Sequence, residues 1–257
     1  LPFNTGFKEK MTVQLPDNLG PTSPYWLDKP WSLGMYDVDD REMIGEPVTP
    51  RSLRLQFNME IDGQDVSFER DVVYKYNDPV RGEVYQPFEI VPEVSSSIRS
   101  KVVLFDDNSP REIPVVVNPN KDGLSGTVRL EAPEGWGVEP KSADFSAKNK
   151  EEEIVVHFMV TPPQKQSEGV LKPIVETANG AFDKSLVEID YEHIPKQMVF
   201  LPSGSKVVRL DLNKKMGRIG YINGAGDEVA KYLKQIGYEV REIDPKLISE
   251  RSLSQYD

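Results

Sequence analysis

Alternation of apolar and polar positions is the dominant pattern along this chain, and it predicts strands. Between residues 52 and 61 every second side chain is apolar, which is the period expected of a strand with one covered face. Asp62 and Gly63 then supply a tight turn, and the pattern resumes over residues 66–73. This stretch therefore predicts a β-hairpin. Extended structure is also expected over residues 72–76 and in a short strand over Met11–Leu15.

A second β module is predicted from about residue 86 to residue 192. Short apolar or alternating runs recur there every 8–12 residues, separated by turns rich in Gly, Pro and Asn, and this spacing is typical of a sandwich. Trp136, in the turn after one of these runs, could bind a sugar ring, but we expect it to cap the sandwich core. The predicted strands cover residues 88–91, 101–105, 114–118, 125–132, 153–160, 171–176 and 185–191.

The pattern changes after Pro195. Two more strands are expected over residues 198–201 and 207–212, followed by a strand at 218–222, a helix from Val229 to Ile236 and a strand at 238–243. The last three elements form a βαβ unit, whose strands should be parallel.

We therefore predict a mainly β chain with two immunoglobulin-like β-sandwich modules followed by a short α/β (βαβ) segment. The first module, residues 1–85, should be partial, because its four confident strands fall short of a seven-stranded sandwich. The second module spans residues 86–195, and the α/β segment spans residues 196–257. We also expect the chain to be a piece of a longer polypeptide.

Composition excludes several classes of function. With no cysteine in the chain, thiol catalysis, disulfides and cysteine-based zinc sites are ruled out. A net charge of −11 without runs of Lys or Arg argues against nucleic acid as a partner. No apolar run approaches the ~20 residues of a membrane span.

Candidate metal and anion sites all have a simpler interpretation. His157 and His193 are the two histidines, too few for the three ligands of a typical catalytic zinc. The carboxylates at residues 37–40 and 106–108 could bind calcium, but they also suit turns. The loop at residues 223–227 invites phosphate, yet Asp227 is better placed to cap the next helix. We assign no catalytic residue, no metal site and no cofactor.

Four aromatic residues offer a candidate ligand site. Their flat faces could stack on a sugar ring, although aromatics this dense near prolines also suit a lid over a sandwich core. Asp78, Arg81 and Glu83 form a polar turn that we expect to be fixed by an ion pair. The candidate sugar-binding residues are Tyr25, Trp26, Trp31 and Tyr36.

Five motifs in a fixed order give the chain a family likeness. They are Pro24–Leu27, Asp78–Glu83, Gly126–Pro133, Asp190–Pro195 and Arg218–Asp227. Their succession resembles the region downstream of the catalytic domain in large bacterial LmbE-like (PIG-L family) deacetylases. In that family a zinc-dependent N-acetyl-sugar deacetylase domain precedes sandwich modules, one of them similar to the NEW3 domain, and a glutamine-amidotransferase-like α/β domain follows.

The resemblance implies an accessory region without chemistry of its own. The family's His-Pro-Asp-Asp metal motif is missing from this sequence, so this chain is expected not to be an enzyme. Its implied role is to position the catalytic domain, or the substrate of that domain, and its implied location is periplasmic or extracellular. The expected partners are an upstream catalytic domain of the same polypeptide and a polysaccharide. A carbohydrate-binding module that uses the surface aromatics is the alternative.

Overall fold

The computed structural model describes residues 6, 8–16, 19–29, 31–215, 217–248, 253, 255 and 256. The chain divides into two compact units, and each is made of two stretches of sequence. The hairpin unit comprises residues 1–91 and 188–199, and the sandwich unit comprises residues 92–187 and 200–257. These units do not coincide with the predicted modules, because the chain returns from the second unit to the first at residue 188. The prediction of a mainly β chain is confirmed.

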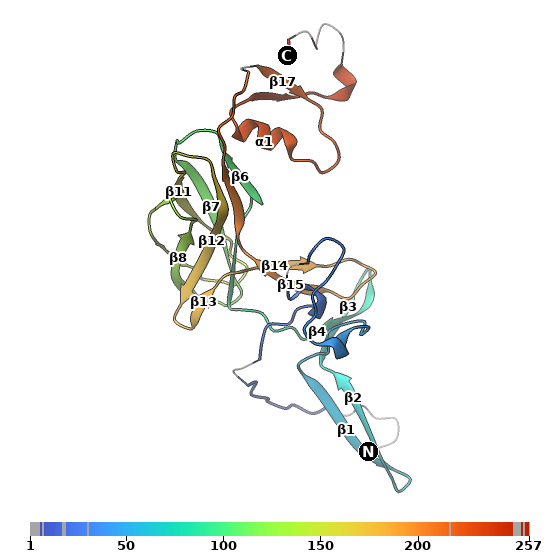
Figure 1. Ribbon diagram of the computed structural model, residues 1–257. Coiled ribbons are helices and arrows are strands. Elements are labelled where there is room, and N and C mark those ends of the chain that lie inside the picture. The colour runs from blue at the N-terminus through green and yellow to red at the C-terminus, as the bar shows by residue number, and fades with distance from the viewer. Residues whose placement is uncertain are drawn as a thin grey trace. The chain divides into compact units, whose positions relative to one another are not determined.

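The hairpin unit contains two separate antiparallel hairpins (Figure 1). Strand β1 (Arg54–Ile61) pairs with β2 (Gln64–Asp71), and β3 (Val73–Asp78) pairs with β4 (Gly82–Pro87). Asp62 and Gly63 both have positive φ, 51° and 77°, as the predicted tight hairpin turn requires. The described residues of this unit therefore form hairpins and not a closed sandwich.

Irregular chain and two short 3₁₀ helices, Tyr25–Leu27 and Arg41–Met43, precede these hairpins. The strand predicted over Met11–Leu15 is wrong, because those residues take no regular structure. No partner strand lies beside them in the described chain, so their backbone groups have no ladder to join.

A buried polar cluster holds the hairpin unit together. The guanidinium of Arg51 lies 2.5 Å from the carboxylate of Glu89, and both side chains are about nine-tenths buried. Burial raises the pKa of Glu89, and the charge of Arg51 opposes that rise only in part. Thr22 binds the backbone of Ile90, the residue after Glu89: its amide donates to the Ile90 carbonyl and its hydroxyl accepts from the Ile90 amide, both at 2.8 Å. Of the unit's described residues, only Thr22, Pro24 and Val199 are buried.

The sandwich unit is built from two sheets. One has the order β10-β8-β12-β16-β6, with β13 added beside β12, and the other has the order β5-β7-β11-β9. The strands are β5 (Val94–Ile98), β6 (Val102–Phe105), β7 (Arg111–Pro119), β8 (Ser125–Glu131), β9 (Gly137–Glu139), β10 (Ala143–Ser146), β11 (Ile154–Thr161), β12 (Ser167–Thr177), β13 (Gly180–Phe182) and β16 (Ser205–Arg209).

Side chains from both sheets meet in one apolar core. Phe158 and Val115 come from the four-stranded sheet, Phe105 and Leu171 come from the other, and all four are fully buried. Trp136 is 8% exposed, packs edge-on against Phe105 at 5.2 Å and donates its indole N–H to the Ser167 hydroxyl at 3.1 Å. Trp136 is therefore a core cap, as its place in the sequence predicts.

The boundary of this unit differs from the predicted one at residue 195. Strand β16 was expected within the α/β segment, but it lies between β12 and β6 in the sandwich sheet and runs parallel to β6. Its inward residues Ser205, Val207 and Arg209 are buried. Strands β14 (Lys184–Ile189) and β15 (Gln197–Pro202) form a separate two-stranded sheet at the point where the chain passes between the units.

The βαβ unit is present as predicted. Strand β17 (Arg218–Tyr221), helix α1 (Val229–Gln235) and strand β18 (Glu239–Glu242) follow in order, and the strands are parallel. A last 3₁₀ helix covers Pro245–Leu247. No helix in the described part of the chain is long and apolar enough to cross a membrane.

Helix α1 is tied to the sandwich at its C-terminal end. Arg111 donates to the Gln235 carbonyl at 2.7 Å, and Lys214 donates to the Ile236 carbonyl at 2.5 Å. Cations suit this position because helix C-termini carry partial negative charge. Asp106 accepts from both cations at 2.5 Å. Burial raises the pKa of Asp106, but the hydrogen bond from Lys214 and the two positive charges outweigh it, so the net shift is downward.

Candidate functional site

The four aromatics predicted as a sugar platform differ in their contacts and exposure. Tyr25 and Trp26 pack edge to face with centroids 4.9 Å apart, and the Tyr25 hydroxyl donates to the Glu46 carbonyl at 3.1 Å. Trp31 and Tyr36 are 57% and 59% exposed. Among the described residues, no ring contact joins either of them to the Tyr25–Trp26 pair.

The two carboxylate clusters make local contacts. Asp37 and Asp39 both pair with Lys29, at 3.7 and 2.5 Å. The Asp40 carboxylate accepts from the Glu42 amide at the start of a 3₁₀ helix, and Asp106 binds the cations beside α1. Within the described residues, no group of three or more His, Cys, Asp or Glu side chains could hold a metal ion.

The histidines and the glycine-rich loop are likewise engaged locally. His157 Nδ1 lies 3.0 Å from Glu112 on the neighbouring strand, and both side chains are about half exposed. The ring of His193 stacks on that of Tyr191 at 5.9 Å. In the loop before α1, the Asp227 carboxylate accepts from the amides of Gly224 at 2.8 Å and Val229 at 3.3 Å. Hydrogen bonds from these backbone amides lower the pKa of Asp227, so its own carboxylate occupies the place an anion would take.

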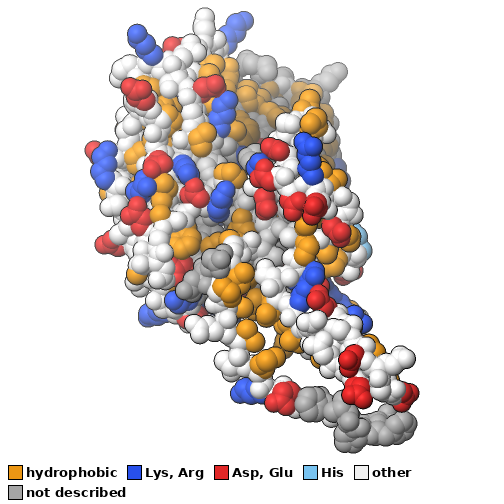
Figure 2. Space-filling model, turned by 60° about the horizontal axis from the view of Figure 1, so that its bottom comes forward, with side chains coloured by type: hydrophobic (Ala, Val, Ile, Leu, Met, Phe, Trp, Pro, Cys, Tyr) orange, Lys and Arg blue, Asp and Glu red, His pale blue; other side chains and the backbone are white. Residues whose placement is uncertain are grey.

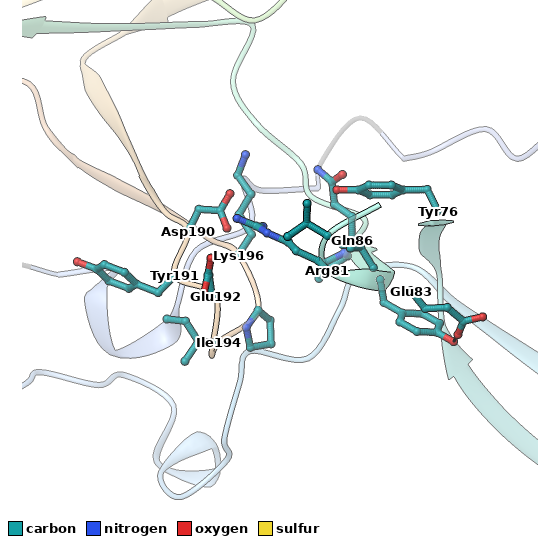
Figure 3. A pocket seen from close by; sticks show the side chains of 14 residues that line it. Tyr76, Arg81, Glu83, Gln86, Asp190, Tyr191, Glu192, Ile194 and Lys196 are labelled. Atoms are coloured by element: carbon teal, nitrogen blue, oxygen red, sulfur yellow. Dashed lines mark hydrogen bonds between the residues drawn. The ribbon is translucent and has the colours of Figure 1, made fainter. Parts of the chain in front are cut away.

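A cavity of about 660 Å³ in the hairpin unit is the best candidate for a ligand site. Two segments separated by about 100 residues form it: the β3–β4 hairpin and the stretch from residue 190 to residue 196. In Figure 3, Arg81 extends from the hairpin toward the 190–196 segment, whereas the Tyr191 ring and the Glu83 carboxylate point to opposite outer sides. Its lining residues are Tyr76, Val80, Arg81, Glu83, Val84, Tyr85, Gln86, Pro87, Asp190, Tyr191, Glu192, Ile194, Pro195 and Lys196.

The hairpin wall of this pocket is pre-organised by its turn. The Asp78 carboxylate accepts from the amides of Val80 and Arg81, both at 2.8 Å. These two hydrogen bonds lower the pKa of Asp78 and fix the turn that carries Arg81. The predicted ion pair within this turn is wrong, because the Asp78 carboxylate binds backbone amides instead of Arg81. The Arg81 guanidinium points into the pocket region.

Neighbouring side chains also fix the orientation of Glu83. Its carboxylate pairs with Lys75 at 2.7 Å and accepts from the Tyr85 hydroxyl at 2.8 Å. The hydrogen bond from Lys75 is the main reason that the pKa of Glu83 is lowered, and the same bond raises the pKa of Lys75. The Lys75 ammonium also lies 5.2 Å from the centre of the Tyr85 ring. This wall therefore presents an ordered tyrosine and an ionised carboxylate.

Three charged groups of the pocket make no side-chain hydrogen bond or ion pair within the described chain, although the charge of Arg81 helps to lower the pKa of Asp78. These groups are the side chains of Arg81, Asp190 and Glu192. Lys196, by contrast, pairs with Glu188 at 2.5 Å. Tyr191 is 62% exposed and Tyr76 is 38% exposed, so aromatic surface lies beside these groups. The pocket thus combines free donors, free acceptors and ring faces in one place.

Sequence reasoning did not identify this pocket as a site. It assigned an ion pair to the turn at residues 78–83 and considered His193 only as a zinc ligand. The available signal was that Asp78–Glu83 and Asp190–Pro195 both belong to the motifs that carry the family likeness. Only the fold shows that these two motifs line one cavity.

Comparison with known proteins leaves the family open. No protein-family model matches the chain, and no curated protein matches it either. Among solved structures, the chain is similar to WR4, a member of the MSP family from C. elegans, at 8% identity and a TM-score of 0.25. The match covers 47% of this chain and 100% of that chain. A likeness of this size carries no argument about function.

Proposed function

We propose that this chain is a non-catalytic accessory region that binds a carbohydrate polymer in the hairpin-unit pocket. The observation that carries the proposal is the combination of exposed tyrosine rings with unpaired Arg81, Asp190 and Glu192 in one cavity. Sugar rings present apolar C–H faces that pack on aromatic rings. Their hydroxyls both donate to carboxylates and accept from guanidinium N–H groups.

The pocket's residue types favour binding over chemistry. Its lining includes no Ser, Thr, Cys or His, the residue types that most often act as nucleophile or base. Asp190 and Glu192 are exposed, whereas a carboxylic acid that donates a proton at neutral pH needs a buried site that raises its pKa. A solvent-open set of donors and acceptors suits recognition of a neutral polyhydroxylated ligand.

The resemblance to LmbE-like deacetylases supplies the biological setting of this proposal. In that setting the region holds an N-acetyl-sugar polymer close to a zinc-dependent deacetylase domain of the same exported polypeptide. The sandwich unit, with its large apolar core, serves as a rigid spacer. The role as a scaffold and the role as a carbohydrate-binding module then become two aspects of one function.

Titration of the whole chain with N-acetylglucosamine oligomers, followed by NMR or calorimetry, tests the binding step. We expect saturable binding that Tyr191→Ala and Arg81→Ala each weaken at least about 10-fold, since each removes a group that contacts the ligand. Trp31→Ala and Tyr36→Ala are matched controls and should leave binding unchanged. Loss of binding in these two controls alone would move the site to the N-terminal aromatics.

Mass spectrometry of the natively expressed protein tests the setting separately. The expected result is a longer polypeptide that contains a His-Pro-Asp-Asp zinc motif upstream of this region. A native protein without such a domain would contradict the link to deacetylases but would not bear on the carbohydrate site. Absence of binding to any glycan at millimolar concentration would remove the carbohydrate site.

A further inference from the structure

Strands β1 and β2 form an amphipathic ribbon whose apolar face is partly exposed. The register pairs Phe57 with Phe68 and Met59 with Val66, so these side chains lie on one face. The two phenyl rings stack with centroids 5.0 Å apart. The apolar face comprises Leu55, Phe57, Met59, Ile61, Val66 and Phe68, and the opposite face comprises Arg54, Gln56, Asn58, Glu60, Asp65, Ser67, Glu69 and Asp71.

Exposure of this face is unusual for so regular a pattern. Leu55, Phe57, Met59, Ile61 and Val66 are between 36% and 51% exposed. Within the described chain, no third strand pairs with either edge of the ribbon. An isolated two-stranded ribbon is marginally stable in water unless another layer covers its apolar face. The ribbon therefore presents an apolar surface of the kind that a protein–protein interface buries.

We propose that a second copy of this chain covers the apolar face, with the two ribbons antiparallel and face to face. A two-fold axis through the middle row of the ribbon, at Asn58 and Ser67, places the base of one ribbon against the tip of the other. The row of Leu55 and Arg70 then faces the row of Ile61 and Gln64, with Asp62 beside it. Such an arrangement is isologous and closes at the dimer.

Charge at the two ends of the ribbon favours this occupant. Arg70 lies on the apolar face, with its guanidinium 5.3 Å from the centre of the Phe68 ring. Its hydrogen bond in the described chain goes to the Glu69 carbonyl at 3.0 Å, not to a carboxylate. Asp62, at the tip, has no hydrogen-bond or ion-pair partner among the described residues. Antiparallel packing brings each Arg70 to the partner's Asp62, which a parallel arrangement does not.

Other charges do not oppose this contact strongly. Glu60 and Asp65 lie on the opposite face of the ribbon. The net charge of −11 is spread over the whole chain, so most of the repulsion between two copies acts beyond the Debye length of about 8 Å and is screened at physiological salt. On the face that Figure 2 shows, Lys and Arg side chains are interspersed with Asp and Glu side chains. Local complementarity therefore decides the outcome.

The size of the face sets the expected affinity. Large apolar side chains carry on the order of 150 Å² each, so the five that are about two-fifths exposed offer roughly 300 Å² per copy. Stable complexes bury about 800 Å² per partner, so the dimer should be weak and reversible. We expect a dissociation constant of about 100 μM.

Sedimentation velocity on the whole chain, at chain concentrations from about 5 to about 500 μM, measures the dissociation constant and tests the proposal. Phe57→Glu should raise the dissociation constant at least about 10-fold, whereas Asn58→Glu, which adds the same charge to the polar face, should not change it. Asp62→Asn keeps the turn, since Asn tolerates positive φ, and should raise the constant about 3-fold while reducing its salt dependence. A monomer at every concentration overturns the proposal and leaves the face to a different protein.

Single-cysteine variants give an independent readout, because the chain has no cysteine of its own. Met59→Cys, close to the proposed axis on the apolar face, should form a disulfide-linked dimer on mild oxidation. Glu60→Cys, one position further on the polar face, should remain monomeric. Equal cross-linking of the two variants would contradict face-to-face packing. The ribbon variants keep Arg81 and Tyr191, so their glycan binding should be unchanged, and failure of the dimer proposal is distinguishable from failure of the proposed function.

Discussion

Strands β1 and β11 carry the same alternation, yet one is exposed along its whole length and the other alternates between buried and exposed residues. In β11, Val156, Phe158 and Val160 point into the core between two sheets. In β1, Phe57 and its apolar neighbours have, among the described strands, only β2 beside them. A period of two therefore specifies a strand and its two faces, but the covering layer depends on other strands far along the chain.

The two units also differ in what holds them together. The sandwich unit has a continuous apolar core, whereas the best-buried interaction of the hairpin unit is the ion pair between Arg51 and Glu89. Apolar cores lose stability in proportion to the volume removed, while a buried ion pair is costly mainly when one partner is left alone. Substitutions in the two units should therefore follow different rules.

Truncation of the sandwich core should have the largest effect. Phe158→Ala leaves a cavity around a fully buried ring and should lower the free energy of unfolding of the sandwich unit by about 3–5 kcal/mol. Urea denaturation followed by tryptophan fluorescence measures this loss. His157→Ala, on the exposed face of the same strand, should stay within about 0.5 kcal/mol of the parent. Similar losses for the two would mean that β11 is not a core strand.

Removal of the buried cation should have the next largest effect, confined to the hairpin unit. Arg51→Ala strands the Glu89 carboxylate, one oxygen of which already has no hydrogen-bond partner, and should cost the hairpin unit about 3 kcal/mol. Hydrogen exchange measured by mass spectrometry should show faster exchange in residues 19–91. Accompanying changes in β11 would show that the two units unfold together.

Loss of the carboxylate between Arg111 and Lys214 should have an intermediate effect. Asp106→Ala leaves both cations without their shared acceptor and should destabilise the attachment of α1 by about 1–3 kcal/mol. Exchange of the amides of α1 and β18 reports this directly. Asp107→Ala removes only a contact to the Ser109 amide and should leave α1 protected. Unchanged protection in the Asp106 variant would show that the helix is held by its apolar contacts.

Truncation of the exposed ribbon should be mild. Phe57→Ala removes a ring that is 41% exposed and stacked on Phe68. At micromolar concentration, where the proposed dimer should be dissociated, the loss should stay below about 1 kcal/mol. The same chemical change therefore costs several times more in β11 than in β1. Thermal unfolding of the Phe57 and Phe158 variants side by side measures the ratio.

Acidification should produce the smallest effect, at the pocket wall. Because the pKa of Glu83 is lowered in the folded chain, its contribution is complete above the ordinary glutamate pKa and is lost as the pH falls through the lowered value. The amide signals of β3 and β4 in NMR spectra should shift over this acidic range. Glu83→Gln should abolish the dependence, and an unchanged titration in that variant would assign it to another carboxylate.

Local signals in the sequence were sufficient for much of the fold. The turn at Asp62 and Gly63, the alternating strands of the sandwich, the role of Trp136 and the βαβ order all follow from spacing and turn chemistry. The parallel pairing of β16 with β6 does not, because residues 205–209 alternate in the same way whichever sheet receives them. Neither does the pocket, since the proximity of Arg81 to Asp190 arises from a chain reversal about 100 residues long.

The hairpin unit is discontinuous in sequence, and this has a consequence for synthesis. Residues 1–91 leave the ribosome first, but the far wall of the pocket, residues 190–196, follows only after the strands from β5 to β13. The pocket therefore cannot be completed until most of the inserted sandwich has been translated. A chain stopped at residue 187 would contain both hairpins and yet lack half of the pocket.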